Sequence, residues 1–155
     1  MVMVYNNFQS LTLFMKQTQI QKIALDSCVV IDLIEKPQVA FGLKARLRGK
    51  QIKIVLCDVV LQEVQRVRGL STKTIIEKIS KILGREIELS NIDEQNKETA
   101  NDISSQFQIC HNGDNKILSL CQAKDFVLVT FDRMLLKTCQ FVGVTGFHPS
   151  MVRGI

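Results

Sequence analysis

Residues 126–130 read FVLVT and form the clearest β-strand pattern in the chain. A short apolar run that is rich in β-branched and aromatic residues is typical of a strand buried inside a parallel sheet. Working outward, residues 21–26 (QKIALD) and 52–57 (IKIVLC) have the same character. These three runs predict the centre of a buried sheet.

Helical patterns separate the predicted strands. Helices are expected over residues 29–34, 38–48, 58–68, 71–84, 91–108, 114–123 and 132–139, with short strands at 86–89 and 142–145. Asp58 is predicted to cap the third of these helices, and Asn91 with Glu94 to open a capping box on the fifth. Strands that alternate with helices indicate βαβ units, and therefore a three-layer α/β domain around a mainly parallel sheet of five strands.

Length and composition fit one domain. The chain has 155 residues and is 46% hydrophobic, which is enough for a single core. Residues 1–20 have no clear period, so we treat them as an N-terminal extension and residues 21–155 as the single domain. No apolar run approaches the roughly 20 residues of a membrane-spanning helix and no signal-peptide pattern is present, which predicts a soluble, cytoplasmic protein with no membrane partner. Five cysteines without a C-x-x-C pair argue against a disulfide framework or a zinc finger.

The positive charge is concentrated in one part of the chain. The formal net charge is +5, and residues 44–85 hold 11 basic against 3 acidic residues. Such a stretch either binds the phosphates of a nucleic acid or forms a solvated helical face, and the sequence leaves both interpretations open. The candidate phosphate contacts are Lys44, Arg46, Arg48, Lys50, Arg66, Arg68 and Arg133.

Four acidic residues stand at matching places in the predicted order of strands and helices. Asp26 ends the first strand, Glu63 lies in the helix after the second, Asp114 opens the helix before the fourth, and Asp132 follows the fourth. Ligands of parallel sheets bind beyond the carboxyl ends of the strands, where these acids can converge. An all-carboxylate cluster suits a hard divalent cation such as Mg²⁺ or Mn²⁺. Each aspartate could instead cap a helix, and Glu63 could be a surface residue.

The segments that carry these acids resemble the four acidic motifs of the PIN-domain nucleases. They read IALDSCVVIDLI, VLCDVVLQEVQRV, GDNKILSLCQ and VLVTFDRMLLKTC, and the resemblance covers about residues 22–145. It implies a PIN-like α/β/α sandwich with strand order 3-2-1-4-5. It also implies that Asp26, Asp114 and Asp132 bind Mg²⁺ or Mn²⁺, with Glu63 completing the catalytic set.

One residue departs from the family pattern. PIN domains carry Asp-Thr/Ser-Asn/Ser after the first strand, whereas this chain has Asp26-Ser27-Cys28. The departure removes a polar side chain that usually supports the metal site, without removing a carboxylate. The hydroxyls of Ser27 and Thr130 are candidates to orient the ligating carboxylates or a water molecule.

The resemblance implies a metal-dependent endoribonuclease that hydrolyses RNA phosphodiester bonds, of toxin–antitoxin or RNA-processing type. The alternative is a catalytically degenerate PIN-like module that binds RNA or protein. RNA is the expected partner, and an antitoxin, an RNA-processing protein or a second copy in a homodimer are further candidates. A Cys–His nucleophilic site at Cys110, His111 and His148 is disfavoured because no oxyanion-hole motif accompanies it. Asp32, Asp58 and Asp102 are assigned to capping or to solvent.

Overall fold

A computed structural model describes residues 21–48, 51–107 and 113–151. Its single sheet has five strands in the order β3-β2-β1-β4-β5, and every neighbouring pair is parallel. The strands are β1 (Gln21–Leu25), β2 (Ile52–Cys57), β3 (Ile87–Ser90), β4 (Val127–Val129) and β5 (Gly146–Phe147). The predicted fold class and strand order are confirmed.

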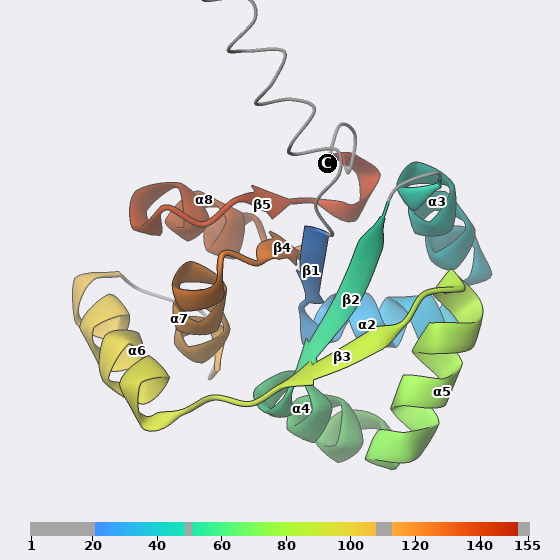
Figure 1. Ribbon diagram of the computed structural model, residues 1–155, viewed down its shortest axis with the longest axis horizontal. Coiled ribbons are helices and arrows are strands. Elements are labelled where there is room, and N and C mark those ends of the chain that lie inside the picture. The colour runs from blue at the N-terminus through green and yellow to red at the C-terminus, as the bar shows by residue number, and fades with distance from the viewer. Residues whose placement is uncertain (1–20, 49–50, 108–112, 152–155) are drawn as a thin grey trace, which may run out of the picture.

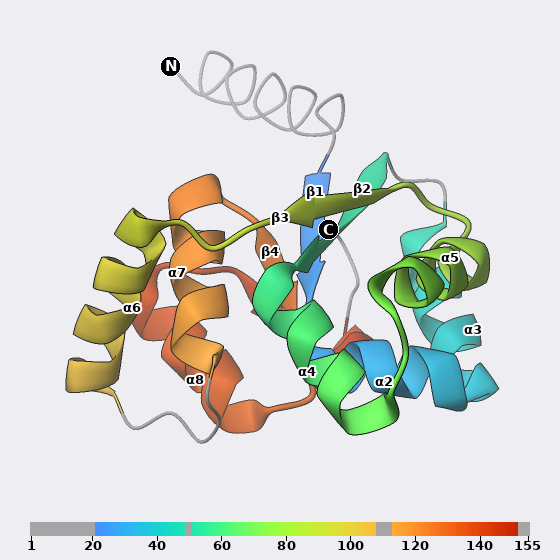
Figure 2. The same cartoon turned by 90° about the horizontal axis from the view of Figure 1, so that it is seen from below.

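Helices cover the sheet on both sides (Figures 1 and 2). The helices α2, α3, α4 and α5 gather on one side, and α6, α7 and α8 on the other. Their bounds are α2 (Ser27–Glu35), α3 (Pro37–Leu47), α4 (Asp58–Arg68), α5 (Thr72–Leu83), α6 (Glu94–Gln106), α7 (Asp114–Lys124) and α8 (Arg133–Val142), followed by the short 3-10 helix η1 (Pro149–Met151). Among the described residues, no helix combines the length and the apolar character needed to cross a membrane.

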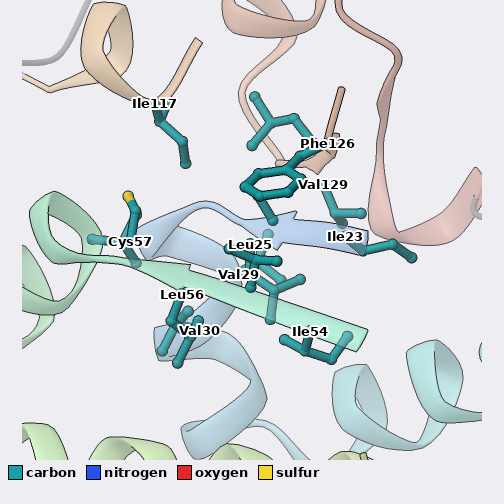
Figure 3. Close-up of a cluster of buried hydrophobic side chains, with 14 of the residues drawn as sticks. Ile23, Leu25, Val29, Val30, Ile54, Leu56, Cys57, Ile117, Phe126 and Val129 are labelled. Carbon is teal, nitrogen blue, oxygen red and sulfur yellow. The ribbon is translucent and has the colours of Figure 1, made fainter. Parts of the chain in front are cut away.

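The core lies between the sheet and the two helical layers. Figure 3 shows Val30 of α2 beside Leu56 of β2 on one side of the sheet, and Ile117 of α7 on the other. All three side chains are at most 2% exposed. Burial on both faces explains why the central strands read as nearly continuous apolar runs, because a parallel sheet has no solvated face.

The strand register aligns the ends of β1, β4 and β5. Leu25 pairs with Val129, and Val129 pairs with Phe147. The pairing continues past the strands, because the Asp26 amide donates to the Val129 carbonyl and the Thr130 amide donates to the Phe147 carbonyl. The first residues beyond β1 and β4 therefore stand side by side at the carboxyl edge of the sheet.

Several local predictions were wrong by a few residues. The strand expected at 142–145 is instead β5 at Gly146–Phe147, because α8 continues to Val142 and stops at Gly143, whose φ of 73° is left-handed. The capping box belongs to Asp93 and Asn96 rather than to Asn91 and Glu94. The Asp93 carboxylate accepts from the Asn96 amide at 2.8 Å, and the Asn96 side chain accepts from the Asp93 amide at 3.1 Å.

Asp58 also has a different role from the predicted one. It is the first residue of α4, and Cys57 occupies the capping position. The Asp58 carboxylate accepts from the Val59 amide at 2.8 Å and from the Ile92 amide at 3.2 Å. Asp58 thus ties the start of α4 to the segment between β3 and α6.

Candidate active site

Asp26 is the first residue after β1 and the N-cap of α2. It is 7% exposed, and three donors surround its carboxylate. The Ser27 amide donates to Oδ1 at 2.8 Å, while the Thr130 hydroxyl at 2.7 Å and the Cys28 thiol at 3.4 Å both donate to Oδ2. A carboxylate offers about four lone pairs, so Oδ2 is fully used and Oδ1 keeps one for a further partner.

The Cys28 thiol is held in its protonated form. Burial, reinforced by the negative charge of Asp26, raises the pKa of this thiol to about 12. A protonated thiol is a weak hydrogen-bond donor, which agrees with its contact to the Asp26 carboxylate. Its sulfur also lies 3.8 Å from the Thr130 hydroxyl oxygen. Cys28 is the supporting residue that the sequence pattern gave no reason to expect, because cysteine departs from the polar residue usual at this position.

Thr130 joins the first and fourth predicted acids. Its hydroxyl donates to Asp26 and accepts from the Asp132 amide at 3.0 Å, and the side chain is 0% exposed. The Asp132 carboxylate caps α8, because its Oδ1 accepts from the Met134 amide at 2.9 Å and the Leu135 amide at 3.2 Å. Asp132 therefore has the capping role that the sequence left open, and its backbone amide is joined to the Asp26 carboxylate through the Thr130 hydroxyl.

Glu63 contacts the same edge through a second hydroxyl. Ser27, which is 7% exposed, donates from its side chain to Glu63 Oε2 at 2.9 Å. On its other side, Glu63 Oε1 lies 4.0 Å from Arg66 Nη2. The two hydroxyls expected to orient the acids therefore join the Asp26 carboxylate to the Asp132 backbone amide, and α2 to Glu63.

Asp114 begins α7 on the opposite helical layer and is 6% exposed. The residue before it, Gly113, has a φ of 100°, which an L side chain rarely adopts. A Cβ on Gly113 would also lie 2.6 Å from Val59 Cγ1, so this turn brings the start of α7 against α4. The backbone thus needs a glycine immediately before the third predicted acid.

The chemistry of these donors fits a hard divalent cation, because all are carboxylate oxygens and Asp26 keeps a lone pair. Within residues 21–48, 51–107 and 113–151, no three His, Cys, Asp or Glu side chains are grouped so that they could hold one ion together. Mg²⁺ is commonly held by only one or two carboxylates, with waters and substrate phosphates completing its shell. The predicted set of three direct ligands, Asp26, Asp114 and Asp132, stays a prediction.

The predicted basic residues that the structure describes lie near opposite ends of the strands. Lys44, Arg46 and Arg48 lie at the end of α3, which leads into the amino end of β2. Since β2 has six residues, about 20 Å of strand at roughly 3.3 Å per residue separates them from the carboxyl edge. Arg68 is paired with Glu35, which lowers the pKa of that carboxyl.

Of these basic residues, Arg66 and Arg133 are the ones that lie near the acids. Arg66 approaches Glu63, and Arg133 directly follows Asp132 and is exposed. Lys50 is outside the described residues, as are Cys110, His111 and residues 1–20.

The remaining described candidates, Asp32, Asp102 and His148, have other surroundings. Asp32 pairs with Lys36 at 3.3 Å, and Asp102 is exposed on α6. The His148 ring packs edge-to-face on Phe131 with 5.2 Å between centroids, and its Nδ1 accepts from the Ser150 amide.

The family comparison agrees with this arrangement. The PIN domain family model matches residues 23–140, about three quarters of the chain and all four acidic motifs. No curated protein matches the sequence.

Solved structures show the same fold. One is VapBC2 from Rickettsia felis bound to a promoter DNA fragment. Its sequence is 19% identical to this chain and the TM-score is 0.63, and the match covers 83% of this chain and 98% of the other. VapBC-1 from nontypeable Haemophilus influenzae is 15% identical with a TM-score of 0.60, over 84% and 99%. FitAcB from Neisseria gonorrhoeae is 20% identical with a TM-score of 0.54, over 83% and 99%. At these identities the likeness is one of fold.

Proposed function

This chain belongs to the PIN domain family, and we propose that it is a cytoplasmic, metal-dependent endoribonuclease that hydrolyses RNA phosphodiester bonds. The observation that carries the proposal is the hydrogen-bonded link from Asp26 through Thr130 to Asp132 at the carboxyl edge of the sheet. The link joins the Asp26 carboxylate to the Asp132 backbone, so two acidic residues that follow β1 and β4 are held where parallel sheets bind their ligands. Residues 21–155 act as one catalytic domain in this proposal.

Asp26, Asp114 and Asp132 would hold Mg²⁺ or Mn²⁺, directly or through bound waters. Such an ion lowers the pKa of a bound water and neutralises charge on the scissile phosphate. Asp26 contributes the Oδ1 lone pair, because its Oδ2 already accepts from Thr130 and Cys28. Glu63, fixed by the Ser27 hydroxyl, is available to orient a water molecule.

The phosphates of the RNA would meet Arg133 and Arg66 next to the acids. Arg133 is exposed and directly follows Asp132 at the start of α8, so its guanidinium is available to solvent and to RNA at this end of the sheet. Arg66 is 74% exposed in its side chain and only loosely paired with Glu63. Lys44 and Arg48 would reach only RNA that extends to the other edge of the sheet.

A protein partner is part of the proposal. Structures with this fold have been solved as VapBC2 and FitAB bound to DNA fragments. For this chain, an antitoxin-like protein or an RNA-processing protein would regulate or deliver the nuclease. A homodimer stays a prediction.

The test is RNA cleavage and RNA binding measured on the same single-stranded RNA panel, with Mg²⁺, Mn²⁺ or EDTA. We expect wild type to cut with metal and leave 5′-phosphate ends, and Asp26→Asn to lose at least about 100-fold in rate while still shifting RNA in a gel. Asp102→Asn on the exposed face of α6 is the matched control and should cut like wild type.

Binding by wild type without cleavage under either metal would favour the degenerate binding module instead. Cleavage that survives both EDTA and Asp26→Asn would exclude the proposed mechanism.

A further inference from the structure

We propose that Cys28 is a positioning residue for the metal, and that its thiol fixes which oxygen of Asp26 the cation meets. This inference rests on the proposed function, since it concerns the same carboxylate. It goes beyond that function because cysteine departs from the residue types that PIN domains carry at this place.

The two oxygens of the Asp26 carboxylate accept different numbers of hydrogen bonds from the described residues. Oδ2 accepts from two side chains, the Thr130 hydroxyl at 2.7 Å and the Cys28 thiol at 3.4 Å. Among the described residues, Oδ1 accepts only from the Ser27 amide at 2.8 Å. With two lone pairs on each oxygen, Oδ2 has no place for a cation and Oδ1 has one.

Thr130 alone would not give this result. Its hydroxyl has a single proton, which it donates to Asp26 Oδ2, and its oxygen accepts from the Asp132 amide. Without the thiol, one lone pair of Oδ2 would be open as well, and both oxygens would compete for the ion. The terminal torsion of aspartate is broad and roughly two-fold, so such a carboxylate could turn between the two arrangements.

Besides packing against the core and a hydrogen bond with the Phe131 backbone, the thiol contacts two side chains. Its sulfur contacts Asp26 Oδ2 and lies 3.8 Å from Thr130 Oγ1. Both neighbours belong to the same link between the acids. Outer partners that orient a ligating side chain typically change metal affinity 10- to 100-fold when they are removed.

The experiment measures the dissociation constant of Mn²⁺ by calorimetry on the full chain, without RNA, and the melting temperature of each variant in EDTA. We expect Cys28→Ala to raise the Mn²⁺ Kd about tenfold, the lower end of that range, because a thiol is a weak donor. Cys28→Ser keeps a donor and should stay within about threefold of wild type. The control is Cys139→Ala, which removes a more deeply buried thiol from α8 and should leave the Kd unchanged.

The variants separate positioning from packing. A packing role alone would lower the melting temperature of Cys28→Ala in EDTA and leave its Kd like that of Cys139→Ala, and this result would overturn the proposal. Equal or tighter Mn²⁺ binding by Cys28→Ala would overturn it too.

Asp26→Asn distinguishes the two proposals. If Asp26→Asn abolishes Mn²⁺ binding while Cys28→Ala leaves the Mn²⁺ Kd unchanged, only the proposed role of Cys28 is wrong. If Asp26→Asn binds Mn²⁺ like wild type, the ion is elsewhere and both proposals fall.

Discussion

Replacing Thr130 by valine should destabilise the protein far more than its small change in volume suggests. The side chain is 0% exposed, and its hydroxyl makes two hydrogen bonds that valine cannot make. The bond to the Asp26 carboxylate is charge-assisted and contributes about 1.5–3 kcal/mol, and the bond from the Asp132 amide about 0.5–1.5 kcal/mol. The new methyl group would lie against a buried carboxylate, so its burial would recover little of the lost free energy. We expect a loss of about 3 kcal/mol in the free energy of unfolding.

Thermal unfolding in EDTA measures this loss without any contribution from bound metal. For a chain of this length, about 3 kcal/mol corresponds to a fall in Tm of roughly 6–12 °C. Thr138→Val is the matched control, because Thr138 is also buried but its hydroxyl donates to the Met134 carbonyl within its own helix. It should lose about 1 kcal/mol or less. If Thr130→Val and Thr138→Val melt within about 2 °C of each other, the link between Asp26 and Asp132 is not the stabilising feature described here.

Three further predictions concern the turn before Asp114, the basic residues and alkaline pH. Gly113→Ala should lower Tm clearly more than Gly143→Ala, because both positions have positive φ but only at Gly113 would the new Cβ meet a neighbour, Val59 at 2.6 Å; equal shifts would contradict this. Arg133→Ala should weaken the binding of a short single-stranded RNA, measured by fluorescence anisotropy, more than Arg48→Ala, because Arg48 lies at the opposite edge of the sheet; the reverse order would place the RNA elsewhere. Burial raises the pKa of the four described cysteine thiols from 9.0 to about 11 or higher, so the stability that they contribute is complete below pH 9 and is lost as pH rises through the folded-state pKa values. Tm should therefore fall as the pH rises from about 9 to about 11, and the fall should be smaller in Cys139→Ala.

The sequence predicts the centre of the fold well because the central strands are buried on both faces. Only apolar, β-branched runs satisfy that environment, and β1, β2 and β4 all lie within two residues of their predicted bounds. The edge strand β5 was misplaced because it has only two residues and little pattern. The end of α8 depends on the left-handed backbone of Gly143. A glycine in the sequence does not by itself indicate whether a helix ends there or continues up to it.

The candidate site is predictable in part for the same reason. The acids stand at the ends of elements, so their place follows once the strand order is known, and Ser27 and Thr130 follow with them. The proposed role of Cys28 rests on its contact with Asp26 only two residues away, but the sequence pattern did not indicate it because cysteine departs from the polar residue usual at this position. The placement of the basic residues could not be predicted, because charge clustering along the chain says nothing about which end of the strands a helix end reaches.

The most direct test of the account is a crystal structure of the full chain grown with Mn²⁺, with the ion located by its anomalous signal. The account predicts an ion about 2.1 Å from Asp26 Oδ1, with Asp132 and Asp114 bound to it directly or through water. An ion that contacts Asp26 through Oδ2, or lies away from the carboxyl edge of the sheet, or is absent at saturating Mn²⁺, would contradict it.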